Sequence, residues 1–568
     1  MNIIPDRPAV LLGPFYYLDN FAFVLEWVSL RYGDLLDGEE RAFIERFAAL
    51  PQMSRALLVR MVMRKGKLFR ASKLRYEEIG ETARAMQPLV EESWVEADPE
   101  LTLEQLFGLL TRNEFAAALG LGVAKTARKD ELYDMAAQSD SVPRRFSQWC
   151  AGLADCAYEI RTGAVCDRLR LMFFGNLYQD WSEFILSDLG ICTYEKVEFS
   201  LDSRAFHTRA DVDLYLYYQA CRELFHGGGE DEDIETELAR LAQVECDVLA
   251  AHCANPWLRE RRARLLFQVG QRLEQLESHD AALRVYALCD YPGARLRRIR
   301  VLEKSEQLAH AMTLTREAQA APESAAETQG LARLLPRLAR KLALPREAAQ
   351  RLRAAERLDL VLPAPTADYY VEELARAHFA ARDPKARVFY VENALINSLF
   401  GLLCWDAVFH AVPGAFFHPF QSGPADLHSA EFFKRREGAL RACLDQLDST
   451  CHGARYRDTI RDNFVRKAGL QSPFVFWSVL DEELLELALD CIPAAHLARW
   501  FERILADVAG HRSGFPDLVA FWPAERRYRM IEIKGPGDRL QDNQIRLIDF
   551  ALTHDMPLAV CHVAWEEA

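Results

Sequence analysis

The chain has 568 residues, of which half are hydrophobic and 27% are charged; this composition is typical of globular proteins, and the length is too great for a single hydrophobic core. Its net charge of −15 excludes a global basic field, so any binding of nucleic acid must come from local patches of cations. The 13 scattered cysteines contain no Cys-x-x-Cys pair, and the apolar run near the N-terminus is broken by Pro14, Asp19 and Glu26. We therefore expect no zinc finger, disulfide framework, signal peptide or membrane span, and we expect a cytoplasmic protein of several domains.

Residues 15–90 show the spacing of amphipathic helices and contain a dense run of cations. Such a run often belongs to the solvated end of a helix, but in a protein that acts on DNA it would bind duplex phosphates. The cations are Arg64, Lys65, Lys67, Arg70, Lys73 and Arg75.

Two further helix patterns flank a loop that contains glycine between residues 101 and 145. The part from Leu119 onward resembles a SAP-type helix–loop–helix, because a Leu-Gly pair and a short loop precede the cations Lys125, Arg128 and Lys129. A helix N-terminus beside cations suits a phosphate backbone. An ordinary helical hairpin is the alternative.

Residues 151–235 continue the helical pattern as far as an acidic, glycine-rich turn, and residues 236–365 are helical and rich in Ala, Leu and Arg. Helix pairs of similar length predict a degenerate solenoid of TPR-like hairpins. Between Arg259 and Arg300 there are 10 arginines against 5 acidic residues. This local excess indicates an anionic partner, unless the arginines pair with the acidic residues among them.

The last domain, from residue 366 onward, begins with a long apolar helix that we expect to open at Glu392. A glutamate in the first turn of a helix usually lies exposed and favours the helix dipole. His410 and His418 flank a Gly/Pro turn and are expected to be structural, since hard cations prefer oxygen ligands.

Residues 512–547 predict a strand, a turn, a second strand and a helix. If the two strands form a hairpin, Asp517 lies close to Glu532 and Lys534, beside the backbone carbonyl of Ile533. Two carboxylates and a carbonyl suit Mg²⁺, and a neighbouring lysine can orient a water molecule. The pattern Asp…Glu-x-Lys on a hairpin resembles that of PD-(D/E)xK nucleases, although a cross-strand Glu/Lys pair often only solvates a sheet face.

Longer segments resemble one family more closely. The segments GFPDLVAFW, MIEIKGPGDRLQDNQIRLIDF and PLAVCHV are similar to the VRR-NUC domain of the Fanconi-anaemia-associated nuclease family. The segments YYLDNFAFVLEWV, KLRYEEI and FGLLCWDAVF resemble further blocks of that family in the same order, so the resemblance covers nearly the whole chain.

The resemblance implies roles for individual residues. Asp517, Glu532 and the Ile533 carbonyl would hold one Mg²⁺ or Mn²⁺, and Glu392 would complete the site and allow a second ion. Lys534 would position the attacking water, with Gln544 orienting the water or the lysine. Arg512 would hold a substrate phosphate, although Asn543 stands where vertebrate members have a lysine.

The resemblance also implies a function and a fold. We expect a mainly α protein with a C-terminal α/β domain that cuts 5′ flaps, acts as a 5′ exonuclease and serves in interstrand-crosslink repair on branched DNA. It would be a monomer of the bacterial form, without a ubiquitin-binding zinc finger and associated with the nucleoid; a dimer on DNA stays open. A Holliday-junction resolvase and a catalytically inactive DNA-binding adaptor are the alternatives. The expected domains are an N-terminal helical domain, a SAP-like module, a helical continuation, a TPR-like domain and a VRR-NUC nuclease domain, at residues 1–100, 101–150, 151–235, 236–365 and 366–568.

Overall fold

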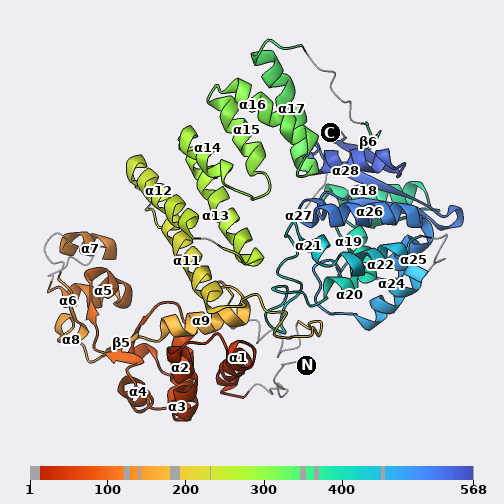
Figure 1. Ribbon diagram of the computed structural model, residues 1–568. Helices are drawn as coiled ribbons and strands as arrows, with labels where there is room; N and C mark the ends of the chain where they lie inside the picture. The colour runs from red at the N-terminus through yellow and green to blue at the C-terminus, as the bar shows by residue number, and fades with distance from the viewer. Residues whose placement is uncertain are drawn as a thin grey trace. The chain divides into compact units, whose positions relative to one another are not determined.

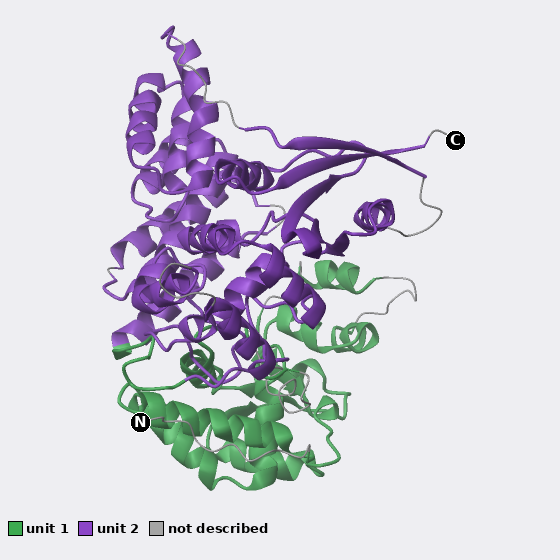
Figure 2. Cartoon of the chain, turned by 90° about the vertical axis from the view of Figure 1, so that its right-hand side faces the viewer, with its two compact units in different colours: residues 1–193, 198–209 green, residues 194–197, 210–568 purple. Residues whose placement is uncertain are grey.

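A computed structural model describes residues 13–120, 128–137, 142–179, 192–229, 232–251, 253–345, 353–363, 370–448 and 455–566. The chain divides into two compact units (Figure 2). Unit 1 comprises residues 1–193 and 198–209, and unit 2 comprises residues 194–197 and 210–568. None of the described helices is both long and apolar enough to cross a membrane.

Unit 1 is built mainly from helices, with short strands between them (Figure 1). Local sequence fixes several helix starts: at α2, for example, Asp37 and Glu40 form a capping box that satisfies the first backbone donors. The elements of this unit are α1 Tyr16–Tyr32, α2 Gly38–Ala49, α3 Gln52–Val62, β1 Leu68–Arg70, α4 Thr82–Glu91, β2 Val95–Ala97, β3 Glu100–Leu101, α5 Leu103–Leu109, α6 Arg112–Ala118, α7 Lys129–Ala137, β4 Arg144–Arg145, α8 Phe146–Trp149, β5 Ala157–Ile160 and α9 Gly163–Phe174.

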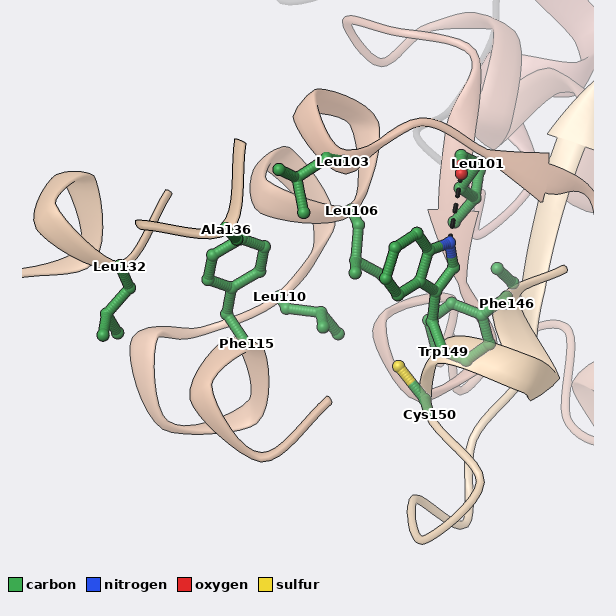
Figure 3. Close-up of a cluster of buried hydrophobic side chains, with 11 residues drawn as sticks. Leu101, Leu103, Leu106, Leu110, Phe115, Leu132, Ala136, Phe146, Trp149 and Cys150 are labelled. Carbon is green, nitrogen blue, oxygen red and sulfur yellow. Dashed lines mark hydrogen bonds between the residues drawn. The ribbon is translucent and has the colours of Figure 1, made fainter. Parts of the chain in front are cut away.

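The expected SAP-like segment has its own hydrophobic core (Figure 3). Side chains from α5, α6, α7 and α8 converge there, and the indole N–H of Trp149 donates to the carbonyl of Leu101 at 3.1 Å. Strands β3 and β4 pair antiparallel beside this core, while β5 lies between β1 and β2 in a three-stranded sheet. These small sheets tie the start and end of the segment together.

The first part of unit 2 is a row of helices, as the sequence predicted. Consecutive helices from α12 to α17 pack against each other and lie side by side in Figure 1. These helices and the one before them are α11 Arg209–His226, α12 Ile234–Ala250, α13 Pro256–Gln275, α14 His279–Ala287, α15 Ala294–Lys304, α16 Leu308–Ala320 and α17 Ala325–Lys341.

The rest of unit 2 is the expected α/β domain. Its sheet has the strand order β6-β10-β9-β8-β7, with β10 parallel to both neighbours and the β7–β8 and β8–β9 pairs antiparallel. The elements are β6 Glu356–Leu362, α18 Val371–Arg382, β7 Arg387–Tyr390, α19 Leu395–Leu403, α20 Trp405–Val408, α21 Phe432–Arg435, α22 Glu437–Asp445, α24 Arg455–Arg466, α25 Glu482–Cys491, α26 Ala494–Ala506, α27 Val508–His511, β8 Leu518–Trp522, β9 Arg527–Lys534, α28 Asp542–Thr553 and β10 Leu558–Trp565.

One local expectation is wrong. Glu392 does not open a helix: strand β7 ends at Tyr390, Glu392 lies in the turn that follows, and α19 begins only at Leu395. The reason is tertiary pairing, because residues 387–390 form an edge strand on β8 that the apolar periodicity of the following helix obscures. This turn places Glu392 near the start of β8, the strand that begins directly after Asp517.

Candidate active site

Strands β8 and β9 form the hairpin that the sequence predicted. Leu518 pairs with Ile531, so Asp517, one residue earlier, lies opposite Glu532. The side chains of Ile531 and Ile533 pack in the hydrophobic core beside the sheet, which confirms that Glu532 and Lys534 belong to the other face. The backbone N–H of Ile533 donates to Oδ2 of Asp517 at 2.7 Å and fixes that carboxylate across the hairpin.

Glu532 is the centre of a short hydrogen-bond network. Its Oε1 lies 2.8 Å from Nζ of Lys534 and accepts a hydrogen bond from Nε2 of Gln544 at 2.6 Å. Gln541 is the N-terminal cap of α28. Its backbone N–H donates a hydrogen bond to the side-chain carbonyl oxygen of Gln544 at 2.9 Å. The helix cap therefore orients the amide of Gln544 so that its donor faces Glu532.

Burial makes the carboxyl groups of Asp517 and Glu532 weaker acids than usual. Asp517 is 8% exposed and Glu532 is 1% exposed. Burial, with the neighbouring carboxylates as a further cause, raises the pKa of Asp517 to about 6 and that of Glu532 to about 7. Two buried carboxyl groups that resist ionisation beside each other are a donor set that fits a hard divalent cation, because such a cation supplies the missing positive charge.

Glu392 also belongs to this site. Its negative charge raises the pKa of both Asp517 and Glu532. The backbone N–H of Val391 donates to the carbonyl of Asp517 at 2.8 Å, so the turn that carries Glu392 is attached to the start of β8. The sequence predicted that Glu392 joins the other carboxylates. In the structure Glu392 lies in a turn, not at the start of a helix, and its charge acts on both Asp517 and Glu532.

Sequence reasoning missed two residues at this site. Glu372, at the start of α18, contributes negative charge that raises the pKa of Asp517, and its neighbour Val371 packs near Gly535, just after Lys534. Tyr390 donates its hydroxyl to Glu392. The only sequence signal for Tyr390 is its place two residues before Glu392, on the same side of the chain.

The acidic side chains do not form a closed metal cage. Within the described ranges, no three or more His, Cys, Asp and Glu side chains are grouped as a metal site. Glu532 has Lys534 and Gln544 as its partners, and the Asp517 carboxylate accepts from Ile533. A divalent ion would be held by Asp517, Glu532 and the Ile533 carbonyl, with Glu392 beside them.

Arg512 lies just before the site but is half-buried. Its guanidinium donates to the carbonyl of Pro473 and lies over the ring of Phe474, 4.8 Å from the ring centroid. Burial lowers its pKa. Asn543, in the first turn of α28, reaches back to Ser513 at 3.4 Å and packs against Gly514.

The cations predicted to bind DNA in unit 1 differ in exposure. Arg64, Lys65, Lys67 and Arg128 are exposed. Lys129 is half-buried and donates to the carbonyl of Phe107, with its ammonium 4.0 Å from the Phe107 ring centroid. Lys125 lies outside the described residues.

Arg70 does not have the role that the sequence suggested. Its side chain is 6% exposed and forms ion pairs at 2.8 Å with both Glu114 and Asp155. Because its guanidinium is buried between two carboxylates, it joins β1 to α6 and to the segment before β5, and it offers no free charge to a phosphate. Arg70 is therefore a structural residue.

The arginine-rich stretch 259–300 is partly neutralised. Arg272 pairs with Glu237 at 2.6 Å, Arg295 with Glu327 at 2.6 Å and Arg297 with Glu274 at 3.1 Å. Two of these glutamates lie outside the stretch. The excess of positive charge in the sequence is thus smaller in the folded solenoid than its local composition suggests.

Comparisons with known proteins give a consistent picture. Three family models match the chain: "FAN1, HTH domain" over residues 15–96, "Fanconi anemia-associated nuclease SAP domain" over residues 100–149 and "VRR-NUC domain" over residues 452–565. A Fanconi-associated nuclease 1 homolog from Pseudomonas aeruginosa is 55% identical over 564 residues, which cover 99% of this chain and 98% of the relative. Human Fanconi-associated nuclease 1 is 24% identical over 655 residues, which cover 98% of this chain and 63% of the relative.

Solved structures agree with this similarity. The crystal structure of paFAN1 bound to a 2-nucleotide 5′-flap DNA with a gap is 55% identical and has a TM-score of 0.89, covering 98% of this chain and 100% of that chain. The structure of paFAN1 with a 1-nucleotide 5′ flap has a TM-score of 0.87 over the same shares of the two chains.

Proposed function

The chain belongs to the Fanconi-associated nuclease 1 family, and from that premise we propose that it is a structure-specific nuclease that cuts branched DNA near a 5′ flap and degrades DNA from 5′ ends in interstrand-crosslink repair. The observation that carries the proposal is the buried pair Asp517 and Glu532, which lie opposite each other on the hairpin. Nζ of Lys534 is 2.8 Å from Oε1 of Glu532. This site combines two buried carboxyl groups, the ammonium group of Lys534 and the side-chain amide of Gln544 on helix α28.

The proposed reaction is hydrolysis of a phosphodiester. A bound Mg²⁺ or Mn²⁺ supplies a water of lowered pKa and offsets negative charge on the phosphate. Asp517, Glu532 and the Ile533 carbonyl would hold the ion, and Glu392 would offer an oxygen to a second one. Lys534 orients the attacking water while Gln544 holds Glu532 in place. The water oxygen forms a bond to phosphorus and gives up a proton to solvent as the bond to the leaving oxygen breaks, and the leaving oxygen takes up a proton from solvent.

The remaining parts of the proposal concern DNA binding. The exposed cations Arg64, Lys65, Lys67 and Arg128 contact duplex phosphates, together with Lys125. Arg512 binds a phosphate near the scissile bond, and burial lowers the pKa of its guanidinium. The protein acts as a monomer in the bacterial cytoplasm at the nucleoid, with the five domains that the sequence predicts.

A cleavage assay tests the nuclease activity. The full chain is incubated with DNA carrying an end-labelled 5′ flap, in the presence of Mn²⁺, Mg²⁺ or EDTA. We expect products with either metal and none with EDTA. Labels at the 5′ and the 3′ end separate flap incision from stepwise removal of nucleotides, and a four-way junction in parallel distinguishes a resolvase. A lack of any metal-dependent product would favour the DNA-binding adaptor.

Two substitutions test the residues. Asp517→Ala and Lys534→Ala should each lower cleavage to background while affinity for the flap DNA, measured in EDTA, stays within about twofold of the wild type. This separation is expected because both side chains are largely buried and their chemistry concerns the ion and the water, not the duplex. Unchanged cleavage by either variant would contradict the assignment.

A further inference from the structure

The turn after β7 holds Glu392 by hydrogen bonds to both of its carboxylate oxygens. The hydroxyl of Tyr390 donates to Oε2 at 2.5 Å, and Nδ2 of Asn393 donates to Oε1 at 3.2 Å. A carboxylate can only accept hydrogen bonds, and each of its oxygens has a second lone pair. The two donors thus fix the plane of the carboxylate and leave one lone pair on each oxygen for another partner.

Asn393 connects this carboxylate to the strand that carries Asp517. Its Oδ1 accepts a hydrogen bond from the backbone N–H of Phe515 at 3.0 Å, two residues before Asp517. Its backbone carbonyl accepts from Nδ2 of the buried Asn397 at 2.7 Å, and the same amide donates to the carbonyl of Arg512 at 2.8 Å. One asparagine side chain therefore spans Glu392 and the backbone just before β8.

The backbone of Asn393 explains why this residue type occurs there. Its φ of +53° lies in the left-handed region, which L residues other than glycine adopt at a cost and which asparagine tolerates better than most. The left-handed turn directs the chain from the end of β7 into α19 while Glu392 stays beside Asp517. Both the backbone conformation and the side-chain amide of Asn393 contribute to this geometry.

We propose that Tyr390 and Asn393 are positioning residues that orient the Glu392 carboxylate toward the divalent ion held by Asp517 and Glu532. The proposal rests on the proposed nuclease function and adds an outer layer to its metal site. Hydrogen-bond partners of metal ligands typically change metal affinity or activity by about 10- to 100-fold when they are removed. Neither side chain needs to touch the ion or the DNA for this effect.

Two variants test the proposal on the full chain. Tyr390→Phe removes only the hydroxyl, and Tyr390 is 43% exposed, so the fold should persist. Asn393→Gly removes the amide but keeps a residue that adopts positive φ freely. The matched control is Tyr370→Phe, because Tyr370 is 80% exposed and no hydrogen bond of its hydroxyl is recorded in the described structure.

The first readout is Mn²⁺ binding, measured by calorimetry without DNA. We expect Tyr390→Phe and Asn393→Gly each to raise the Kd for Mn²⁺ by about 10-fold, while Tyr370→Phe keeps the wild-type value. The second readout is flap cleavage against Mn²⁺ concentration, for which both variants should need more metal and then approach the wild-type rate. DNA affinity in EDTA should not change. Kd values for both variants within twofold of the wild type would overturn the proposal.

Thermal unfolding separates positioning from simple stability. Asn393→Ala is expected to lower the midpoint more than Asn393→Gly, because only alanine is strained at this φ. If Asn393→Gly loses stability but keeps wild-type Mn²⁺ affinity, the residue is structural and its part of the proposal fails. If the wild type itself neither binds Mn²⁺ nor cuts DNA, both the nuclease function and this inference fail; an active wild type beside unaffected variants refutes this inference alone.

Discussion

At the scale of single residues, the buried carboxyl group of Asp517 lowers the stability of the metal-free protein at high pH. Burial and neighbouring carboxylates raise the pKa of Asp517 to about 6, above the ordinary value near 3.8. In the metal-free protein, the folded state therefore retains a proton that the unfolded state has already released between these two values. The stabilising effect of that proton is complete below pH 3.8 and is lost as the pH rises through about 6.

Replacing Asp517 by asparagine should therefore stabilise the metal-free protein at high pH. The asparagine side chain cannot ionise, and its carbonyl oxygen can still accept the hydrogen bond from Ile533. At pH 8 in EDTA we expect Asp517→Asn to raise the free energy of unfolding by about 1–3 kcal/mol, and at pH 4 we expect no gain. Denaturant titrations at the two pH values measure the difference. Added Mn²⁺ should stabilise the wild type and not the variant, and a lower stability of the variant at pH 8 would contradict the argument.

At the scale of elements, the hairpin was predictable and the turn after β7 was not. Strands β8 and β9 are close in sequence, so alternation and one short turn were enough to set their register and the convergence of Asp517 with Glu532. Strand β7 pairs with β8 across more than 100 residues of chain, and no local pattern reveals such a partner. The same limit explains why the sequence suggested a DNA-binding role for Arg70. Its ion-pair partners Glu114 and Asp155 lie 44 and 85 residues away in the chain.

The Arg70 ion pairs should govern the stability of unit 1. The Arg70 guanidinium, followed by the backbone of Thr111, lowers the pKa of Glu114 to about 2. The stabilisation by the Glu114 carboxylate is thus fully present above its ordinary value of 4.5 and is lost as the pH falls toward about 2. Arg70→Ala leaves two carboxylates without their cation and should cost about 3 kcal/mol at pH 7.

Thermal unfolding of Arg70→Ala against the exposed control Arg64→Ala measures this effect. The difference between the two variants should be large at pH 7 and should shrink as the pH falls below 4.5, because Glu114 becomes protonated. An equal midpoint for both variants at pH 7 would show that the ion pairs have no structural role.

Helix α17 of the solenoid also contacts helix α28, which carries Gln544. Arg333 forms a bidentate pair with Asp542, with both distances at 2.6 Å, and Arg546 donates to Gln329 at 2.6 Å. Asp542 is only two residues before Gln544, the partner of Glu532. We expect Arg333→Ala to lower the flap-cleavage rate constant about three- to fivefold with little change in KM, since an exposed pair contributes about 1 kcal/mol or less. Arg340→Ala, an exposed arginine on the same helix, should match the wild type in the same assay.

At the scale of the whole molecule, the net charge opposes DNA binding. A chain of −15 repels a polyanion, so DNA binding requires local attraction at short range, which we propose comes from the exposed cations of unit 1. Lys65 and Lys67 are exposed, and no ion pair of either is recorded in the described structure, so both can release counterions from DNA phosphates. This dependence makes the salt response of binding a direct measure of their role.

The double variant Lys65→Ala/Lys67→Ala should weaken DNA binding without changing the chemistry. Each lost phosphate contact lowers the slope of log K against log salt by about 0.9, so the double variant should lose about 1.8 from the wild-type slope. Affinity for flap DNA at several salt concentrations, measured in EDTA, gives the slope, and single-turnover cleavage at saturating protein should keep the wild-type rate. Lys434→Ala, which removes an exposed cation paired with Glu431 in unit 2, should leave the slope unchanged. An unaltered slope in the double variant would mean that other cations of the chain bind the duplex, because the active-site carboxylates cannot supply that attraction.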